Sequence, residues 1–272
     1  MGINVTAAAQ YSMIGVAGRR LRVGQWHFGP DSQAAGKRPL VLLNGIGMNM
    51  ELLDPVARAL PERRVISFDA PGIGRSPDPV FPYTIPCMAL TLAALLDRMH
   101  IDQVDVIGVS WGGAVAQQFA FQHRARIGKL ALAATSAGTA MIPGNASMLS
   151  HMSDPLEYTV ARTLRRNLAM LYNGGGRHAV SLNAATPPSP VGWACQLSAF
   201  TTWTSAPFLP LLSLPTLILA DEEDQLVPPA NAHFLHNAIR GSRIEMFHGG
   251  GHLFMLSDPD AFAARLRDFL DA

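Results

Sequence analysis

Short runs of apolar residues recur along this chain, each bounded by Gly, Pro or Asp, and most are separated by segments with helical spacing. Nearly all residues of these runs are apolar, as is required of strands that are covered on both faces. The pattern predicts a central, mostly parallel sheet with helices on both faces. The predicted strands are Pro39–Asn44, Arg64–Phe68, Val104–Val109, Lys129–Ala134, Pro215–Ala220 and Arg243–Phe247.

The segments between these runs supply the helices. Apolar residues with helical spacing predict helices over Met50–Leu60, Met88–Met99, Gly112–His123, Pro229–Ile239 and Pro259–Leu270. Asp258 stands in the capping position before the last of them, whose first residue is a proline suited to a first helical turn. Near the start of the chain, Ser12–Ala17 and Leu21–Phe28 flank Gly18-Arg19-Arg20 and predict an antiparallel hairpin at the edge of the sheet.

The regular alternation breaks between about residues 138 and 210. This stretch is rich in Met and has no run that resembles a buried strand. We therefore expect a mainly helical lid over residues 138–207, inserted after the sixth strand when the hairpin is counted. Residues 1–137 and 208–272 would then form the core domain. The alternative is an ordinary strand–helix repeat with poor patterning.

The composition fits a soluble globular chain. Of the 272 residues 49% are hydrophobic and 15% are charged, and the formal net charge is +1, so no basic surface for nucleic acid is expected. No apolar run approaches the roughly 20 residues that span a bilayer, and Met1–Gln10 lacks the pattern of a secretory signal. We expect a cytoplasmic protein without integral membrane association. Cys87 and Cys195 are expected to be buried free thiols.

Ser110 follows the strand Val104–Val109 directly and stands among Gly108, Gly112 and Gly113. A serine at the tip of a sharp strand-to-helix turn needs neighbours without bulk, because the backbone there is strained and the helix leaves close to the strand. Such a turn raises the hydroxyl above the carboxyl ends of the strands. The sequence therefore indicates Ser110 as a nucleophile.

A serine hydroxyl is a poor nucleophile without a base, so a histidine and a carboxylate are expected at the same edge of the sheet. Asp224 and His252 follow the last two predicted strands, and glycines precede His252. The rival acid is Asp221 and the rival base is His248. We expect Asp224 and His252, since they lie far enough past their strands to turn inward over the sheet.

The oxyanion that forms during attack on a carbonyl needs two backbone N–H donors. One is expected from Trp111, next to the nucleophile, and the other from Ile46, in the Gly-containing turn after the first predicted parallel strand. Apolar lid side chains would favour aliphatic acyl chains, or they would form the core of the lid itself. The candidate substrate-binding residues from the lid are Met141, Trp193 and Trp203.

No cofactor and no metal are expected. The Gly-rich run Asp69–Ser76 lacks both nucleotide-binding spacings, and it predicts a structural turn. His233 and His236 have a spacing that some metal sites use, but we expect surface residues there.

Together these motifs resemble the α/β-hydrolase superfamily, and the resemblance covers most of the chain outside the lid. The segments NGIGMNMELL, VIGVSWGGAVAQQFA, LAATSAGTAMIPG and GHLF look like those of the intracellular depolymerases of medium-chain-length poly(3-hydroxyalkanoate). The resemblance implies hydrolysis of ester bonds between 3-hydroxyacyl units at the surface of storage granules, with Ser110, Asp224 and His252 as the catalytic triad. The acid loop at residues 221–225 and the glycines at 249 and 250 depart from that family's pattern, which leaves the substrate open.

We therefore expect a cofactor-free serine hydrolase that attacks an ester carbonyl and passes through an acyl-enzyme. A general carboxylesterase, a lactonase and a carbon–carbon bond hydrolase share the triad and stay open. Dehalogenases and epoxide hydrolases of this superfamily carry an aspartate in place of Ser110, which argues against them. The alternative of another class is a binding protein that has kept the fold without catalysis. The sequence does not give the oligomeric state.

Overall fold

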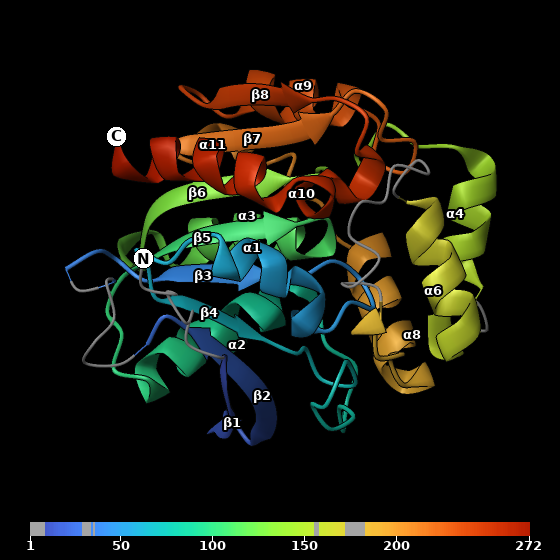
Figure 1. Cartoon of the computed structure of the whole chain (residues 1–272), viewed down its shortest axis with the longest axis horizontal. Coiled ribbons are helices and arrows are strands. Elements are labelled where there is room, and N and C mark those ends of the chain that lie inside the picture. Colours follow the sequence, from blue (N-terminus) through green and yellow to red (C-terminus); the bar gives the residue numbers. More distant parts are fainter. Residues whose placement is uncertain (1–8, 29–33, 35, 155–157, 172–182) are drawn as a thin grey trace, which may run out of the picture.

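An eight-stranded sheet forms the centre of the protein (Figure 1). The computed structural model describes residues 9–28, 34, 36–154, 158–171 and 183–272. Residues 1–8, in the segment predicted to lack a secretory signal, lie outside the described residues. The strands are β1 (Gln10–Val16), β2 (Arg19–Trp26), β3 (Leu40–Leu43), β4 (Val65–Phe68), β5 (Val104–Val109), β6 (Ile127–Ala133), β7 (Thr216–Asp221) and β8 (Arg243–Phe247).

The order of the strands is β1-β2-β4-β3-β5-β6-β7-β8. Strand β2 runs antiparallel to both of its neighbours, and all the other paired strands are parallel. The predicted mostly parallel sheet, with the hairpin at its edge, is therefore confirmed. Because the strands from β3 to β8 are parallel, the loops that follow them meet at one edge.

Helices cover both faces of the sheet, as predicted (Figure 1). On one face lie α2 (Ile85–Arg98), α3 (Trp111–Gln122) and α9 (Ala230–Ala238), and on the other lie α1 (Asp54–Arg58), α10 (Phe254–Ser257) and α11 (Pro259–Asp271). The short 3₁₀ segments are η1 (Met50–Leu53), η2 (Arg124–Arg126), η3 (Leu209–Leu211) and η4 (Gly251–Leu253). Successive residues of the parallel strands, such as Ile218 and Leu219, pack into the two separate apolar layers.

Most element boundaries differ from the prediction by one or two residues, and three of the differences have a clear local reason. The hairpin turn is Ala17–Gly18, where both φ angles are positive (47° and 76°), so β2 begins two residues earlier than expected. The predicted helix at 50–60 is divided into η1 and α1, and Pro55, which has no N–H to donate, lies in the first turn of the second part. Helix α2 begins three residues early, because the Thr84 side chain accepts a hydrogen bond from the Cys87 N–H and caps it.

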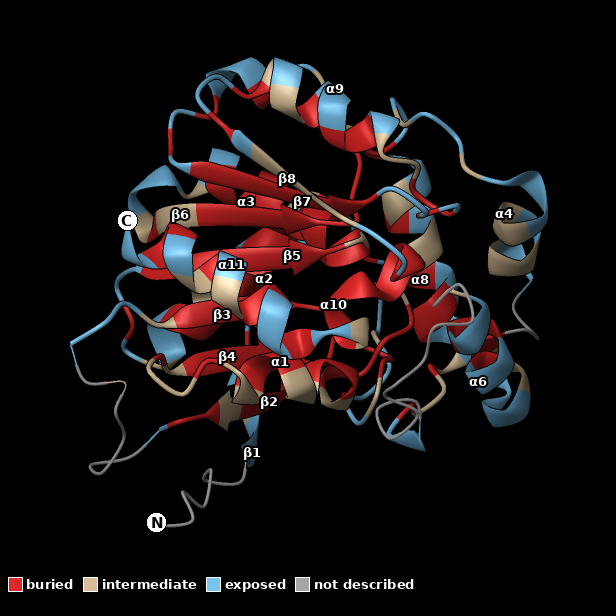
Figure 2. Ribbon diagram, turned by 45° about the horizontal axis from the view of Figure 1, so that its top comes forward, coloured by how far each residue is buried: buried red, intermediate tan, exposed pale blue. Residues whose placement is uncertain are grey.

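The segment between β6 and β7 carries helices that lie beyond the carboxyl ends of the strands (Figure 1). It contains α4 (Ala146–Ser153), α6 (Ala161–Met170) and α8 (Pro190–Thr201), and its described residues form no strand beyond an isolated bridge between Gly138 and Thr204. Helix α8 is buried along one side, whereas α4 has no fully buried residue (Figure 2). The domain limits at 138 and 207 stay a prediction.

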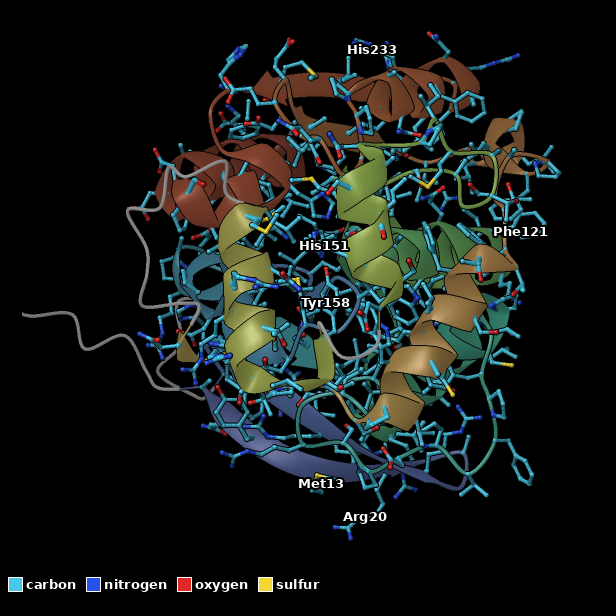
Figure 3. The ribbon with its side chains drawn as sticks, turned by 90° about the vertical axis from the view of Figure 1, so that its right-hand side faces the viewer. Met13, Arg20, Phe121, His151, Tyr158 and His233 are labelled. Carbon is cyan, nitrogen blue, oxygen red and sulfur yellow. The ribbon has the colours of Figure 1, made fainter. Side chains whose placement is uncertain are left out.

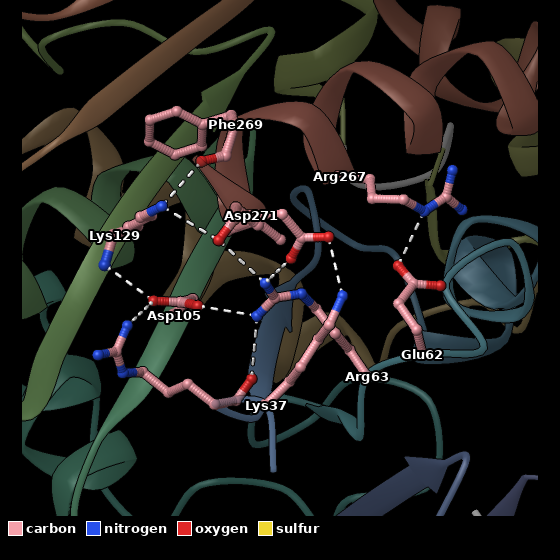
Figure 4. Close-up of polar contacts among 10 residues, drawn as sticks. Lys37, Glu62, Arg63, Asp105, Lys129, Arg267, Phe269 and Asp271 are labelled. Carbon is pink, nitrogen blue, oxygen red and sulfur yellow. Dashed lines mark hydrogen bonds and ion pairs between the residues drawn. The ribbon is translucent and has the colours of Figure 1, made fainter. Parts of the chain in front are cut away.

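A cluster of ion pairs lies at the amino ends of the parallel strands (Figure 4). The buried carboxylate of Asp105, at the start of β5, pairs with Arg38 at 2.9 Å and with Arg63 at 3.1 Å. Arg63 also binds Asp271 at 2.6 Å and the carbonyl of Leu270 at 3.0 Å. The cluster ties the C-terminal helix to the amino ends of the strands, away from the loops that carry the predicted site.

None of the helices in the described ranges is both long enough and apolar enough to cross a membrane. Both cysteines are free, as predicted, and Cys195 is buried. The expected burial of Cys87 is wrong, since this residue lies in the first turn of α2 on the side that faces solvent.

Candidate active site

Ser110 occupies a strained turn between β5 and α3. Its φ and ψ are 53° and −116°, a left-handed conformation that non-glycine residues rarely adopt. A Cβ at Gly108 would lie 2.3 Å from the Gly112 carbonyl oxygen, and one at Gly112 would lie 2.4 Å from the Leu43 oxygen. Only glycine fits at these positions, so the predicted sharp strand-to-helix turn is present. The Ser110 carbonyl accepts a hydrogen bond from the Thr135 hydroxyl at 2.7 Å, which holds the turn in place.

The imidazole of His252 and the carboxylate of Asp224 lie in direct contact. His252 Nδ1 is 2.8 Å from Asp224 Oδ2, and both residues are buried. The other oxygen of Asp224 accepts hydrogen bonds from the N–H groups of Leu226 and Val227, each at 2.9 Å. The carboxylate is therefore fixed by its own loop and faces the imidazole with a single oxygen, an arrangement that can orient the ring.

Asp221, the rival acid, has a different set of partners. Its buried carboxylate accepts hydrogen bonds from Gly250 N–H at 3.0 Å, Gly251 N–H at 3.2 Å and Glu223 N–H at 2.9 Å. It thus ties the loop that holds Asp224 to the loop that holds His252. The rival base, His248, is exposed.

Ser110 lies at the same edge of the sheet as this pair. Ser110, Leu226 and Val227 line one cavity of about 230 Å³, and the backbone of the last two holds Asp224. Among the described residues, no hydrogen bond joins the Ser110 hydroxyl to His252. Hydrogen bonds of this kind are often long in the absence of substrate and shorten when substrate binds.

The two predicted oxyanion donors line the same cavity. Ile46 belongs to a tight turn in which the Met48 N–H donates to the Gly45 carbonyl at 3.2 Å. Trp111 begins α3, so its N–H has no partner within the helix. Within the described part of the chain, no hydrogen bond from either N–H to another protein group is found, so the oxyanion role of both stays a prediction.

The walls of the cavity are apolar and come mainly from α4 and α8. Figure 3 looks onto this end of the molecule, where α4 carries the labelled His151 and α8 is drawn in orange. Met141 lines the cavity, as expected from the sequence. The lining residues that sequence reasoning did not single out are Leu149, Met152, Ser153, Leu197, Phe200, Thr201, Leu226 and Val227. The i, i+3 spacing of Leu197 and Phe200 on one helix is the signal that could have found two of them.

Trp193 and Trp203, expected to bind substrate, do not line this cavity. Trp193 is fully buried and stacks on Tyr158, with ring centroids 4.1 Å apart. The Trp203 indole N–H donates to Gln118 Oε1 at 2.7 Å. Both rings belong to the apolar core clusters, where large aromatic side chains bury a large area.

The Gly-rich run after β4 is a structural turn, as predicted. Its first residue, Asp69, is buried and accepts hydrogen bonds from Met50 N–H at 2.9 Å and Arg75 N–H at 3.1 Å. Burial raises the pKa of Asp69 to about 6. The turn's N–H groups are used within the protein, for example from Ile73 to the Ala70 carbonyl, so they do not form a phosphate cradle.

The described residues contain no group of three or more His, Cys, Asp and Glu side chains that could hold a metal. His236 Nδ1 lies 2.9 Å from the Ser242 hydroxyl, next to the C-terminal end of α9. The expected lack of a metal and of a cofactor stays a prediction.

Comparison with known proteins agrees with this geometry. A family model described as alpha/beta hydrolase fold matches residues 38–259. A poly(3-hydroxyalkanoate) depolymerase of Ectopseudomonas oleovorans is 40% identical over 238 residues, which cover 85% of this chain and 84% of that protein. A pimeloyl-[acyl-carrier protein] methyl ester esterase of Edwardsiella ictaluri is 31% identical over 258 residues, 90% of this chain and 96% of the esterase.

A solved structure has the same fold. The crystal structure of a hydrolase from Pseudomonas aeruginosa PA01 superimposes with a TM-score of 0.82 at 24% identity, over 98% of this chain and 100% of that one. The strand order, the turn at Ser110 and these matches agree, and this chain belongs to the α/β-hydrolase family.

Proposed function

We propose that this chain hydrolyses carboxylic esters with Ser110 as nucleophile, His252 as base and Asp224 as the residue that orients the imidazole. The contact between His252 and Asp224 carries the proposal. A buried carboxylate with one oxygen fixed by two N–H donors and the other on an imidazole is the arrangement that a serine nucleophile needs from its partners. The depolymerase and the methyl ester esterase among the relatives support ester hydrolysis.

The mechanism follows from these contacts. With its Nδ1–H donated to Asp224, the His252 ring has Nε2 free to accept the Ser110 proton as the hydroxyl oxygen attacks the ester carbonyl. The N–H groups of Ile46 and Trp111 stabilise the negative oxygen of the tetrahedral intermediate. His252 then protonates the leaving alcohol, and a water molecule, activated in the same way, releases the acid from the acyl-enzyme.

The substrate in this proposal is an aliphatic 3-hydroxyacyl ester, including poly(3-hydroxyalkanoate). The walls of the cavity include Met141, Leu149, Leu197 and Phe200, and none of the described residues that line it is charged. Such a cavity favours an apolar acyl chain over a charged one. The relative named as a poly(3-hydroxyalkanoate) depolymerase supports the polymer as a substrate. The proposal also includes a cytoplasmic location at the surface of storage granules.

A series of substrates tests the proposal. p-Nitrophenyl esters with acyl chains of two to twelve carbons are assayed beside emulsified poly(3-hydroxyalkanoate), with Ser110→Ala as the control variant. We expect hydrolysis of the longer esters and of the polymer, and loss of both activities in the variant. Activity on short soluble esters alone would contradict the depolymerase assignment and leave a general carboxylesterase. Full esterase activity in Ser110→Ala would contradict the mechanism.

A further inference from the structure

Gln196, in the middle of α8, makes two buried hydrogen bonds to the two halves of the proposed oxyanion site. Its Oε1 accepts the Gly47 N–H at 2.7 Å, and its backbone carbonyl accepts the indole N–H of Trp111 at 3.0 Å. Gln196 itself is only 2% exposed. One residue of the inserted segment therefore contacts both the turn that carries Ile46 and the residue that follows the nucleophile.

The contact at Gly47 holds the peptide that follows Ile46, next to the peptide that carries the Ile46 N–H. In the turn, Gly47 has a φ of +68°, and the Gly45 carbonyl is held by the Met48 N–H. The peptide on each side of Ile46 is thus held at one end, the first by Met48 and the second by Gln196. Without the bond from Gln196, the second peptide is free to rotate and the Gly47 N–H is left buried without a partner.

The helix that carries Gln196 is itself anchored to the sheet domain. The Ser189 N–H, at the start of α8, donates to the Gly72 carbonyl at 2.9 Å, and Trp193 packs fully buried. A donor stabilises an oxyanion best when it is already held within about 0.5 Å of its productive position before the negative charge forms. A helix fixed in this way supplies a rigid base for that position.

We propose that Gln196 is a positioning residue for the oxyanion site, which aligns the Ile46 N–H through Gly47 and the start of α3 through Trp111. This inference rests on the proposed function. In the proposed mechanism Gln196 does not contact the substrate. It affects the rate of ester hydrolysis by holding the oxyanion donors in place. The consequence is a specific loss of transition-state binding, with ground-state binding of the ester unchanged.

Gln196→Leu tests the side-chain contact alone, because the bond from Trp111 goes to the backbone carbonyl and remains. We expect kcat for a p-nitrophenyl ester to fall about 10- to 100-fold with KM within about twofold, less than the loss of a whole oxyanion donor. A trifluoromethyl ketone, which forms a hemiketal oxyanion on the serine, should bind more weakly by the same factor as the fall in kcat/KM. If the Leu variant does not fold, Gln196→Met keeps the length of the side chain and loses the same bond.

Gln118→Leu is the matched control. Gln118 is also a buried glutamine with an indole partner, Trp203, but it does not contact the oxyanion turn. Both variants should unfold at a lower temperature than the wild type, and only Gln196→Leu should lose kcat and ketone affinity. An unchanged kcat in Gln196→Leu, or an equal loss of kcat in Gln118→Leu, would overturn the inference about Gln196. The proposed function would still stand if the wild-type protein hydrolyses the ester. A wild-type protein that hydrolyses no ester would overturn both.

Discussion

His252 Nδ1 lies 2.8 Å from Asp224 Oδ2, and the two side chains come from loops that follow neighbouring strands, β7 and β8. The other Asp224 oxygen is occupied by two backbone N–H groups. Asp224 therefore has a single oxygen, Oδ2, that accepts a hydrogen bond from a single ring nitrogen, Nδ1. This sets the tautomer of the imidazole, with its free nitrogen available to a nucleophile.

Asp224→Asn should lower kcat by a factor on the order of 10⁴, because an amide at this position favours the wrong imidazole tautomer. The loss should appear in kcat, since the apolar cavity that binds the acyl chain is unchanged. The measurement is steady-state hydrolysis of a p-nitrophenyl ester, with the exposed Asp260→Asn as the control. A variant with more than a tenth of wild-type kcat would show that Asp224 does not orient the base.

Asp221→Asn separates the two acids of this loop. The asparagine keeps one acceptor oxygen and loses the acceptor for Gly250 N–H, so the free energy of unfolding should fall by about 1–2 kcal/mol. The fall in kcat should be far smaller than in Asp224→Asn, since the contact between His252 and Asp224 remains. Urea unfolding and ester hydrolysis measure the two effects. A catalytic loss as large as that of Asp224→Asn, with unchanged stability, would make Asp221 the catalytic acid instead.

Leu197→Trp should shorten the acyl chains that the enzyme accepts. Leu197 lines the cavity that contains Ser110, and a larger ring there fills space that a long chain needs. We expect kcat/KM to fall at least tenfold for the twelve-carbon ester and little for the two-carbon ester. Ala194→Trp, on the exposed side of the same helix, is the control and should keep the wild-type profile. A parallel loss across all chain lengths would place the acyl chain elsewhere.

Asp69 should give the stability a dependence on pH that Asp69→Asn removes. Burial raises the pKa of Asp69 to about 6 from its usual 3.8, so between these values the folded protein binds a proton that the unfolded chain does not. Unfolding free energy therefore rises as pH falls from about 6 to about 4, by up to about 3 kcal/mol for this group. Urea unfolding of wild type and variant at pH 4 and pH 7 measures the difference, in which the other carboxyl groups cancel. A wild type that loses stability relative to the variant on acidification would show that the charged carboxylate is the stabilising form.

The strands and the nucleophile turn could be predicted because their determinants are local. A strand covered on both faces needs an unbroken apolar run, and Val104–Val109 has the same bounds in the sequence and in the structure. Ser110 was marked by the glycines around it. Helix boundaries were less accurate, since Thr84 and Pro55 act through capping and a missing N–H, and neither effect belongs to the apolar pattern.

Asp221 and Gln196 could not be assigned their contacts from the sequence. The partners of Asp221 in the His252 loop lie 29 and 30 residues away, and the Gly47 partner of Gln196 lies 149 residues away. No local pattern encodes such pairs. Trp193 and Trp203 illustrate the same limit, because an apolar residue type fits a substrate pocket and a buried core equally well, and only the packing decides between them.

Covalent labelling with a fluorophosphonate tests the central claim most directly, because the reagent reacts with a serine only when a base and oxyanion donors activate it. The account predicts one phosphonyl group for each protein molecule by intact mass, located by peptide mapping on Ser110, and no label on Ser110→Ala. A folded wild-type protein that takes up no label, or a Ser110→Ala variant that is labelled as fast as the wild type, would contradict it.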